Sequence, residues 1–236
     1  MFIEGYYTGG GLMDNNGLGG GLSLVGSLYP TWPQPVPPSA NPLDADYITL
    51  SAWSSTTTFP PGWDPSTDPL PAGFIESQTG TLKTNGSVTV TFSNAVSKTG
   101  SYYLRVIHRN ALESWSTSPF VFGSTTAGVP YDFTTSQGQT KGNNSIDVGT
   151  PLLESPTFAF FSGDIASDAV PGIVGLQDGK ISSEDYGSME TAVYFTILGY
   201  QFEDIWQDQN SVGIAESADY GGEENNVYFT RVAQRP

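Results

Sequence analysis

The sequence predicts a mainly β protein, in which an antiparallel β-sandwich is followed by a small module of two calcium-loop-and-helix repeats. Three observations predict it: short alternating runs between Gly- and Pro-rich turns, an internal repeat near the C-terminus, and acidic residues crowded around that repeat. The 236 residues suffice for a substantial core. We divide the chain into an N-terminal arm (1–46), a sandwich domain (47–161) and a repeat module (162–236).

Charge and composition exclude several classes of partner and site. The chain has 24 Asp and Glu against 8 Lys and Arg, a formal net charge of −16, so we expect it to bind neither nucleic acid nor an anionic membrane surface. No apolar run approaches the roughly 18 residues of a membrane span, so no membrane insertion is expected. Because the chain has no cysteine, disulfides and thiolate metal sites are excluded. The N-terminus lacks the basic and apolar regions of a signal peptide.

The arm at 1–46 combines Gly-rich stretches with the Pro-rich run TWPQPVPPSANP. It keeps apolar and aromatic side chains that a solvated linker would lack, so we expect extended segments lying on a surface of this domain or of a neighbouring subunit. Such an arm could add a strand to the neighbour's sheet. Trp32 in the arm and Trp63 in the loop FPPGWDPSTDP are expected to be exposed, which makes them candidates for carbohydrate binding. Packing in the core or at an interface is the favoured interpretation of the tryptophans.

The region 47–161 carries the strand signals. Alternating or β-branched runs predict strands over Tyr47–Trp53, Ser87–Phe92 and Ser101–Arg109, with Gly- and Pro-containing turns between them. Several short strands at this spacing are typical of an antiparallel sandwich of the immunoglobulin-like or jelly-roll kind. Shorter candidates for strands are PFVF at 119–122, YDF at 131–133 and TFAFF at 157–161.

The last third of the chain contains the internal repeat. DGKISSEDYGSMETAVYF (178–195) aligns with VGIAESADYGGEENNVYF (212–229) at a constant offset of 34, and nine of 18 positions are identical. The surrounding segment, 164–224, has 13 acidic residues and one basic residue, Lys180. Acids crowded in this way repel one another unless a cation is bound.

The second copy has the spacing of a calcium-binding loop. Calcium takes six to eight oxygen ligands, and such a loop places them around a sharp turn. Position 5 departs from the pattern because it is Val212. The residues at positions 1, 3, 6, 9 and 12 of the twelve-residue loop are Asp208, Asn210, Gly213, Glu216 and Asp219.

The first copy retains fewer of these ligands in sequence. Asp178 and Asp185 stand at positions 5 and 12, and an early ligand would have to come from Asp164 or Asp168, across an insertion. We predict bound Ca²⁺, with one site favoured over two. Loops that keep their fold through hydrogen bonds in place of the ion are the alternative.

These motifs resemble known modules. The repeat at 178–229 is similar to type I dockerin modules, which are paired calcium-loop-plus-helix units. The whole chain resembles a C-terminal module of secreted and surface proteins of Bacteroidota, which implies a β-sandwich with a dockerin-like module and an extracellular or cell-surface location. The elements that carry this resemblance are FIEGYYTGGGLM (2–13), IHRNALESWS (107–116), YDFTTSQGQTKGNN (131–144) and SGDI (162–165).

We expect a non-catalytic extracellular structural protein that makes repeated subunit contacts, as in a filament or surface layer, stabilised by calcium. The sole histidine, His108, is expected to be structural at a strand end, and no G-x-S-x-G elbow supplies a nucleophile, so no enzyme is predicted. A carbohydrate- or protein-binding surface module is the alternative. A virion surface protein of a phage is a weaker one.

Overall fold

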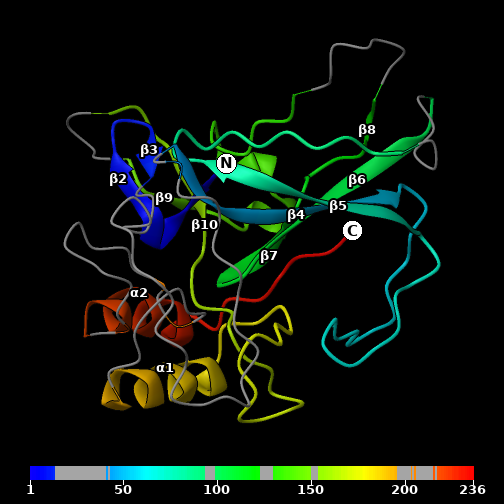
Figure 1. Ribbon diagram of the computed structural model, residues 1–236. Helices are drawn as coiled ribbons and strands as arrows, with labels where there is room; N and C mark the ends of the chain where they lie inside the picture. Colours follow the sequence, from blue (N-terminus) through cyan, green and yellow to red (C-terminus); the bar gives the residue numbers. More distant parts are fainter. Residues whose placement is uncertain are drawn as a thin grey trace.

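Antiparallel strands dominate the computed structural model (Figure 1), as the predicted mainly β class requires. It describes residues 1–13, 41, 43–93, 99–122, 130–149, 154–195, 203, 205, 215 and 217–236. The strands are β1 (Phe2–Ile3), β2 (Tyr7–Gly9), β3 (Leu12–Met13), β4 (Asp44–Ser54), β5 (Phe74–Lys83), β6 (Ser101–His108), β7 (Ala111–Trp115), β8 (Phe120–Val121), β9 (Ile146–Asp147) and β10 (Phe158–Phe160). The helices are α1 (Ser183–Phe195) and α2 (Ser217–Tyr228), with short 3-10 turns η1 (Glu4–Tyr6), η3 (Gln137–Gln139) and η4 (Lys141–Asn143).

The largest sheet has the order β5–β4–β6–β7, with β8 also paired to β6. All of these pairings are antiparallel, and Leu50 of β4 lies opposite Val106 of β6. Both side chains enter the main apolar cluster together with Ile48. The strands predicted at 47–53 and 101–109 are therefore confirmed within β4 and β6, where β-branched and aromatic side chains suit a buried sheet.

The strand predicted over Ser87–Phe92 does not form, although its alternation is meaningful. Val88, Val90 and Phe92 pack against the main cluster, but the segment joins no ladder among the described strands. It covers β5 at Gly80, where a Cβ atom would overlap the side chains of Val88 and Val90. β5 itself was not predicted because its largely polar sequence, FIESQTGTLK, suits the edge of the sheet that it occupies.

The N-terminal residues belong to the core instead of lying on the surface as an arm. β1 pairs in parallel with β10, which pairs antiparallel with β9, while β2 and β3 form a hairpin. The Met1 ammonium donates a hydrogen bond to the Gly86 carbonyl at 2.6 Å. β4 begins at Asp44, inside the predicted arm, of which residues 14–40 lie outside the described part. Within residues 1–13, the side chains buried in the main cluster are those of Phe2, Ile3, Tyr6 and Met13.

The shorter predictions had mixed outcomes. The runs at 119–122 and 157–161 contain β8 and β10, whereas YDF at 131–133 forms no strand. Phe133 is nevertheless buried in the main cluster. Its ring lies 5.3 Å, centroid to centroid, from that of Phe160 in β10. The apolar character of these runs thus predicts burial more reliably than strand pairing.

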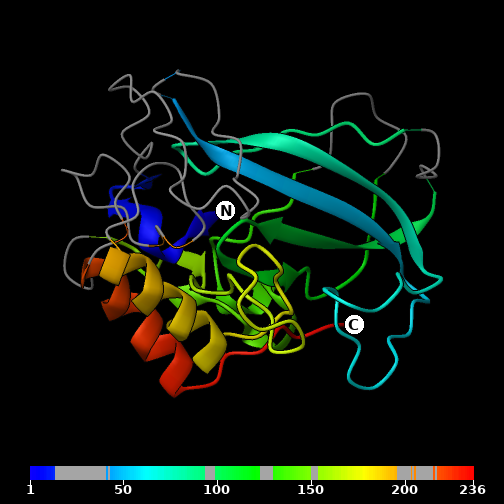
Figure 2. The same cartoon turned by 60° about the horizontal axis from the view of Figure 1, so that its bottom comes forward.

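The repeat forms two helices packed side by side, and the colours in Figure 2 run in opposite directions along them. α1 begins at Ser183 and α2 begins 34 residues later at Ser217, as the repeat offset requires. Ala215, just before α2, clusters with Ala192 near the end of α1. The chain after α2 then returns to the sheet, where Ala233 packs with Leu112 of β7. The segments that flank the helices therefore pack on the β part through a small apolar cluster that is separate from the main one.

Candidate functional site

Asp185 closes the loop before α1. Its Oδ1 atom accepts the backbone N–H groups of Ile165 and Ala166 at 2.7 and 2.8 Å, and its Oδ2 atom accepts that of Ser182 at 2.8 Å. The carboxylate thereby caps the helix and ties it to the segment that follows β10. Burial nevertheless outweighs these bonds and raises the pKa of Asp185 to about 7.

Two further acids of this loop face the ammonium group of Lys180. The Lys180 Nζ atom lies 3.3 Å from Asp168 Oδ2 and 3.7 Å from Asp178 Oδ2. Ser182 donates its hydroxyl to Asp168 Oδ1 at 2.7 Å, and Asp178 accepts the backbone N–H groups of Asp168 and Lys180. The Lys180 ammonium group and nearby hydrogen-bond donors thus satisfy the carboxylates of Asp168 and Asp178, which the sequence analysis considered as calcium ligands.

Asp164 is the most deeply buried acid of the loop. Its Oδ2 atom accepts the Gly179 N–H group at 3.2 Å, while its Oδ1 atom has no hydrogen-bond partner. Burial, followed by repulsion from Asp185, Asp178 and Glu113, raises the pKa of Asp164 well above its ordinary value. Burial thus favours the protonated form of this carboxyl group, whereas a nearby cation would favour the ionised form.

As arranged here, the side chains of the first loop do not fit a calcium shell. Asp185 and Asp178 turn their oxygen atoms towards backbone donors. Within the described ranges, no three Asp, Glu or His side chains are grouped so that they could hold a metal ion. The geometry matches the alternative in which hydrogen bonds hold the loop.

The second loop is described only in part. Asp208, Asn210 and Glu216 lie outside the described residues. Asp219 is buried, and its Oδ1 atom accepts the N–H group of Ile205 at 2.9 Å. It thus ties the start of α2 to Ile205, as Asp185 ties the start of α1 to Ile165. Calcium in this loop stays a prediction.

Trp63 is buried, so the expectation that it is exposed for carbohydrate binding is wrong. Only 4% of its surface is accessible. Arg105 and Arg235 lie over its ring, and its indole N–H group donates to the Pro69 carbonyl at 3.0 Å. Core packing, which the sequence analysis favoured for the tryptophans, accounts for it. Trp32 lies outside the described residues.

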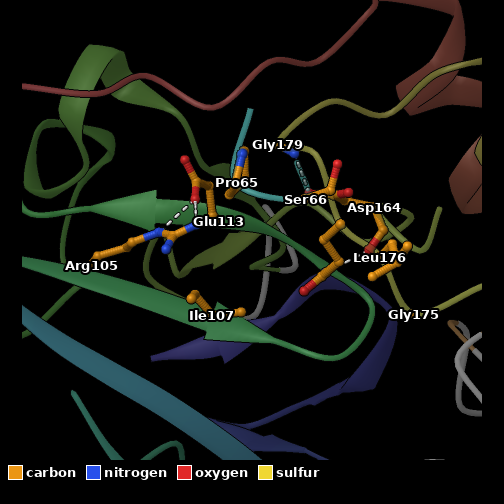
Figure 3. Close-up of a pocket in the computed structure, with 10 residues that line it drawn as sticks. Pro65, Ser66, Arg105, Ile107, Glu113, Asp164, Gly175, Leu176 and Gly179 are labelled. Carbon is orange, nitrogen blue, oxygen red and sulfur yellow. Dashed lines mark hydrogen bonds and ion pairs between the residues drawn. The ribbon is translucent and has the colours of Figure 1, made fainter. Parts of the chain in front are cut away.

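A pocket of about 240 Å³ lies next to this tryptophan, between β6, β7 and the loop before α1 (Figure 3). Arg105 of β6 and Glu113 of β7 line it on one side and Asp164 on the other. Glu113 accepts hydrogen bonds from the Nε atoms of both Arg105 and Arg235. Arg105 and Glu113 thus pair with each other, and the hydrogen bond from Arg235 holds the C-terminal segment on the sheet.

His108 lies in a buried polar network, in keeping with a structural role at a strand end. Its Nε2 atom is 3.0 Å from Asp46 Oδ2, and its ring meets that of Tyr6 edge to face. Arg109 Nε donates to the same Asp46 oxygen at 2.9 Å. Sequence reasoning did not find Asp46, because only the pairing of distant segments brings it to His108.

Two exposed Tyr–Phe pairs stand at the ends of the repeat helices. Tyr194 and Phe195 at the end of α1 are 81% and 46% exposed, and Tyr228 and Phe229 at the end of α2 are 81% and 56% exposed. The rings meet edge to face within each pair, at centroid distances of 5.0 and 5.2 Å. Sequence reasoning recorded these residues as repeat identities but did not identify them as a surface.

Comparisons with protein-family models, with curated proteins and with solved structures find no match to this chain. The resemblance to the Bacteroidota module and to dockerins therefore stays a prediction. In the described part of the chain, neither helix is long and apolar enough to cross a membrane.

Proposed function

We propose that this chain is a non-catalytic extracellular structural protein that associates with further copies of itself through the two Tyr–Phe pairs. The observation that carries the proposal is the exposure of all four aromatic rings at equivalent positions of the repeat. Exposed apolar patches of this kind commonly mark interaction surfaces. Tyr in particular is enriched at protein interfaces because it combines a large apolar ring with a polar end.

Three of the other identities within the repeat have a role inside the molecule. Asp185 and Asp219 each accept the backbone N–H group of an isoleucine before their helix, and the rings of Tyr186 and Tyr220 contact each other at 5.6 Å. Val193 and Val227, which directly precede the aromatic pairs, pack against apolar clusters. In the pairs that follow, both tyrosine rings are 81% exposed and both phenylalanine rings are about half exposed, which supports a role outside the monomer.

The antiparallel packing of α1 and α2 supports repeated contacts. Since the start of α2 lies beside the end of α1, the two aromatic pairs fall at opposite ends of the helix pair. A molecule with equivalent apolar patches at two ends can bind two neighbours at once. Such contacts continue from molecule to molecule when their geometry does not form a closed ring. This arrangement suits a filament or layer.

The finer architecture belongs to the same proposal. The β part would be a sandwich and the helix pair a dockerin-like module, supported by the repeat and its loop spacing. Calcium would stabilise the second loop through Asp208, Asn210, Glu216 and Asp219.

Sedimentation velocity of the full chain tests the proposal. Replacing Tyr194, Phe195, Tyr228 and Phe229 together by Ser is expected to convert assemblies into monomers. A matched control replaces the exposed apolar residues Leu70 and Val121, which lie outside the repeat, by Ser and should leave assembly intact. Equal assembly of both variants would refute the role of the aromatic pairs.

A surface module that binds a glycan or another protein is the second candidate. The same exposed rings favour it, since aromatic rings stack on sugars and anchor protein interfaces. It takes first place if the wild-type chain is monomeric while the four-residue variant loses binding to a glycan array or to a surface protein.

A further inference from the structure

The buried face of α2 differs in chemistry from that of α1. The repeat aligns Glu223 with Met189 and Asn226 with Ala192, and all four side chains are completely buried. Met189 and Ala192 belong to apolar clusters, as expected for a helix face that packs on a core. α2 therefore carries an acid and an amide where its counterpart carries apolar residues, although burying polar groups is costly unless they are bound.

Among the described residues on and near the buried face of α2, four buried oxygen atoms have no hydrogen-bond partner. They are both carboxylate oxygens of Glu223, Oε1 of Glu203 and Oδ1 of Asn226. Glu223 and Asn226 are neighbours on one face of α2 because residues three apart on a helix lie side by side. Asn226 donates its Nδ2 group to Glu4 Oε2 at 2.8 Å and to the Ser162 carbonyl at 2.9 Å, which leaves its Oδ1 atom as an acceptor.

Negative charge prevails around Glu223. Burial, then repulsion from Asp185, Asp219 and Glu203, raises the pKa of Glu223 well above its ordinary value. At Glu203, by contrast, attraction from Arg109 exceeds the repulsion from Asp219. An ionised, buried carboxylate without a partner costs several kcal/mol, so an ionised Glu223 requires a further positive charge.

We propose that a hard divalent cation, Ca²⁺ or Mg²⁺, binds beneath α2 to the carboxylates of Glu223 and Glu203 and to the amide oxygen of Asn226. Such cations take oxygen ligands, and Mg²⁺ is commonly held by one or two carboxylates with water in the remaining positions. Two carboxylates and one amide are fewer ligands than a site built from protein side chains alone would have. Among the described residues, no three acidic or histidine side chains are grouped for such a site. The site lies on the inner face of the helix, apart from the loop position of Asp208.

Isothermal titration of the full chain with CaCl₂ and with MgCl₂, after dialysis against a chelator, tests the proposal. Glu223→Gln should weaken binding of the cation by about tenfold or more, since a charged ligand is lost. Glu224→Gln is the matched control, because it removes the same charge from the next residue, which is exposed. It should bind as the wild type does. Asp208→Asn, which removes a ligand of the predicted loop site, should lose at most the binding at that loop and keep the binding that depends on Glu223.

Thermal unfolding gives a second measurement that does not depend on heats of binding. Glu223→Met places the residue of the first repeat at this position, and it should raise the unfolding temperature in chelator while abolishing the rise that cations give the wild type. The proposal is overturned if the wild type takes up neither cation, if Glu223→Gln binds as tightly as Glu224→Gln, or if Asp208→Asn alone removes binding. None of these outcomes bears on self-association, which sedimentation tests separately.

Discussion

At the scale of single residues, the acids of the repeat hold backbone together. Asp185 satisfies three N–H groups from two segments, and Asp219 repeats one of these contacts in α2. Buried backbone donors must find acceptors, so a carboxylate at this position is required whether or not a metal binds nearby. A calcium-ligand spacing and a helix-capping pattern thus overlap at the same residues.

Asp185→Ala is expected to destabilise the protein strongly. The change leaves three backbone N–H groups without their acceptor, and each unsatisfied buried donor costs about 1–3 kcal/mol. Asp168→Ala, in the same loop but half exposed, should cost much less. Urea denaturation followed by tryptophan fluorescence measures both, and equal midpoints for the two variants would contradict the capping role.

Trp63→Ala is expected to lower the free energy of unfolding by about 3–5 kcal/mol, as removal of a large buried aromatic side chain does. Its ring packs against Trp53 and lies under two arginines. Denaturation in urea gives the change in stability, with Leu70→Ala as the exposed control. A variant as stable as the wild type would show that the tryptophan is not part of the core.

At the scale of elements, the sequence identified the strands and helices whose patterns are local. The alternation of β4 and β6 was sufficient to place two central strands, and the resemblance of the 34-residue repeat to dockerin modules implied its two helices. β5 was not predicted because an edge strand needs few apolar residues. The segment Ser87–Phe92 was mistaken for a strand because alternation reports which side chains are buried and does not report which backbone groups pair.

The candidate site was predictable to a lesser degree, for a related reason. Asp164, Asp178 and Asp185 were identified from spacing, and they do converge on one loop. The role of Glu223 could have been suspected from its mismatch with Met189 in the repeat. Its burial, like that of Trp63, depends on contacts between segments far apart in sequence, which no local pattern encodes.

Deletion of residues 1–13 is expected to unfold the protein instead of merely preventing assembly. This segment supplies β1 to the sheet with β9 and β10, and it places Ile3 and Tyr6 completely inside the main cluster. Circular dichroism in the near ultraviolet should lose its aromatic signal in the truncated chain. A folded, soluble truncated chain would show that residues 1–13 are a detachable arm and not part of the core.

At the scale of the whole molecule, buried acids make stability depend on pH. Burial raises the pKa of Glu203 from 4.5 to about 7, so the folded state keeps a proton that the unfolded state releases between these values. This contribution to stability is fully present below pH 4.5 and is lost as the pH rises to about 7. The loss amounts to about 1.4 kcal/mol per pH unit for one proton.

Urea denaturation in chelator from pH 4.5 to 7 measures this dependence. The wild type should lose stability relative to Glu203→Gln across this window, because the variant has no proton to release. A difference between the two proteins that stays constant with pH would contradict a buried, neutral Glu203.

We propose that copies of this chain associate through apolar aromatic contacts despite a net charge of −16 each. Sedimentation velocity of the wild-type chain in chelator, at NaCl concentrations of about 0.05 M and about 0.5 M, tests it most directly, since salt screens the repulsion between copies and leaves apolar contacts intact. We predict larger assemblies at the higher salt concentration, growing with protein concentration. A monomer under all conditions, or assemblies that dissolve as salt is added, would contradict the claim.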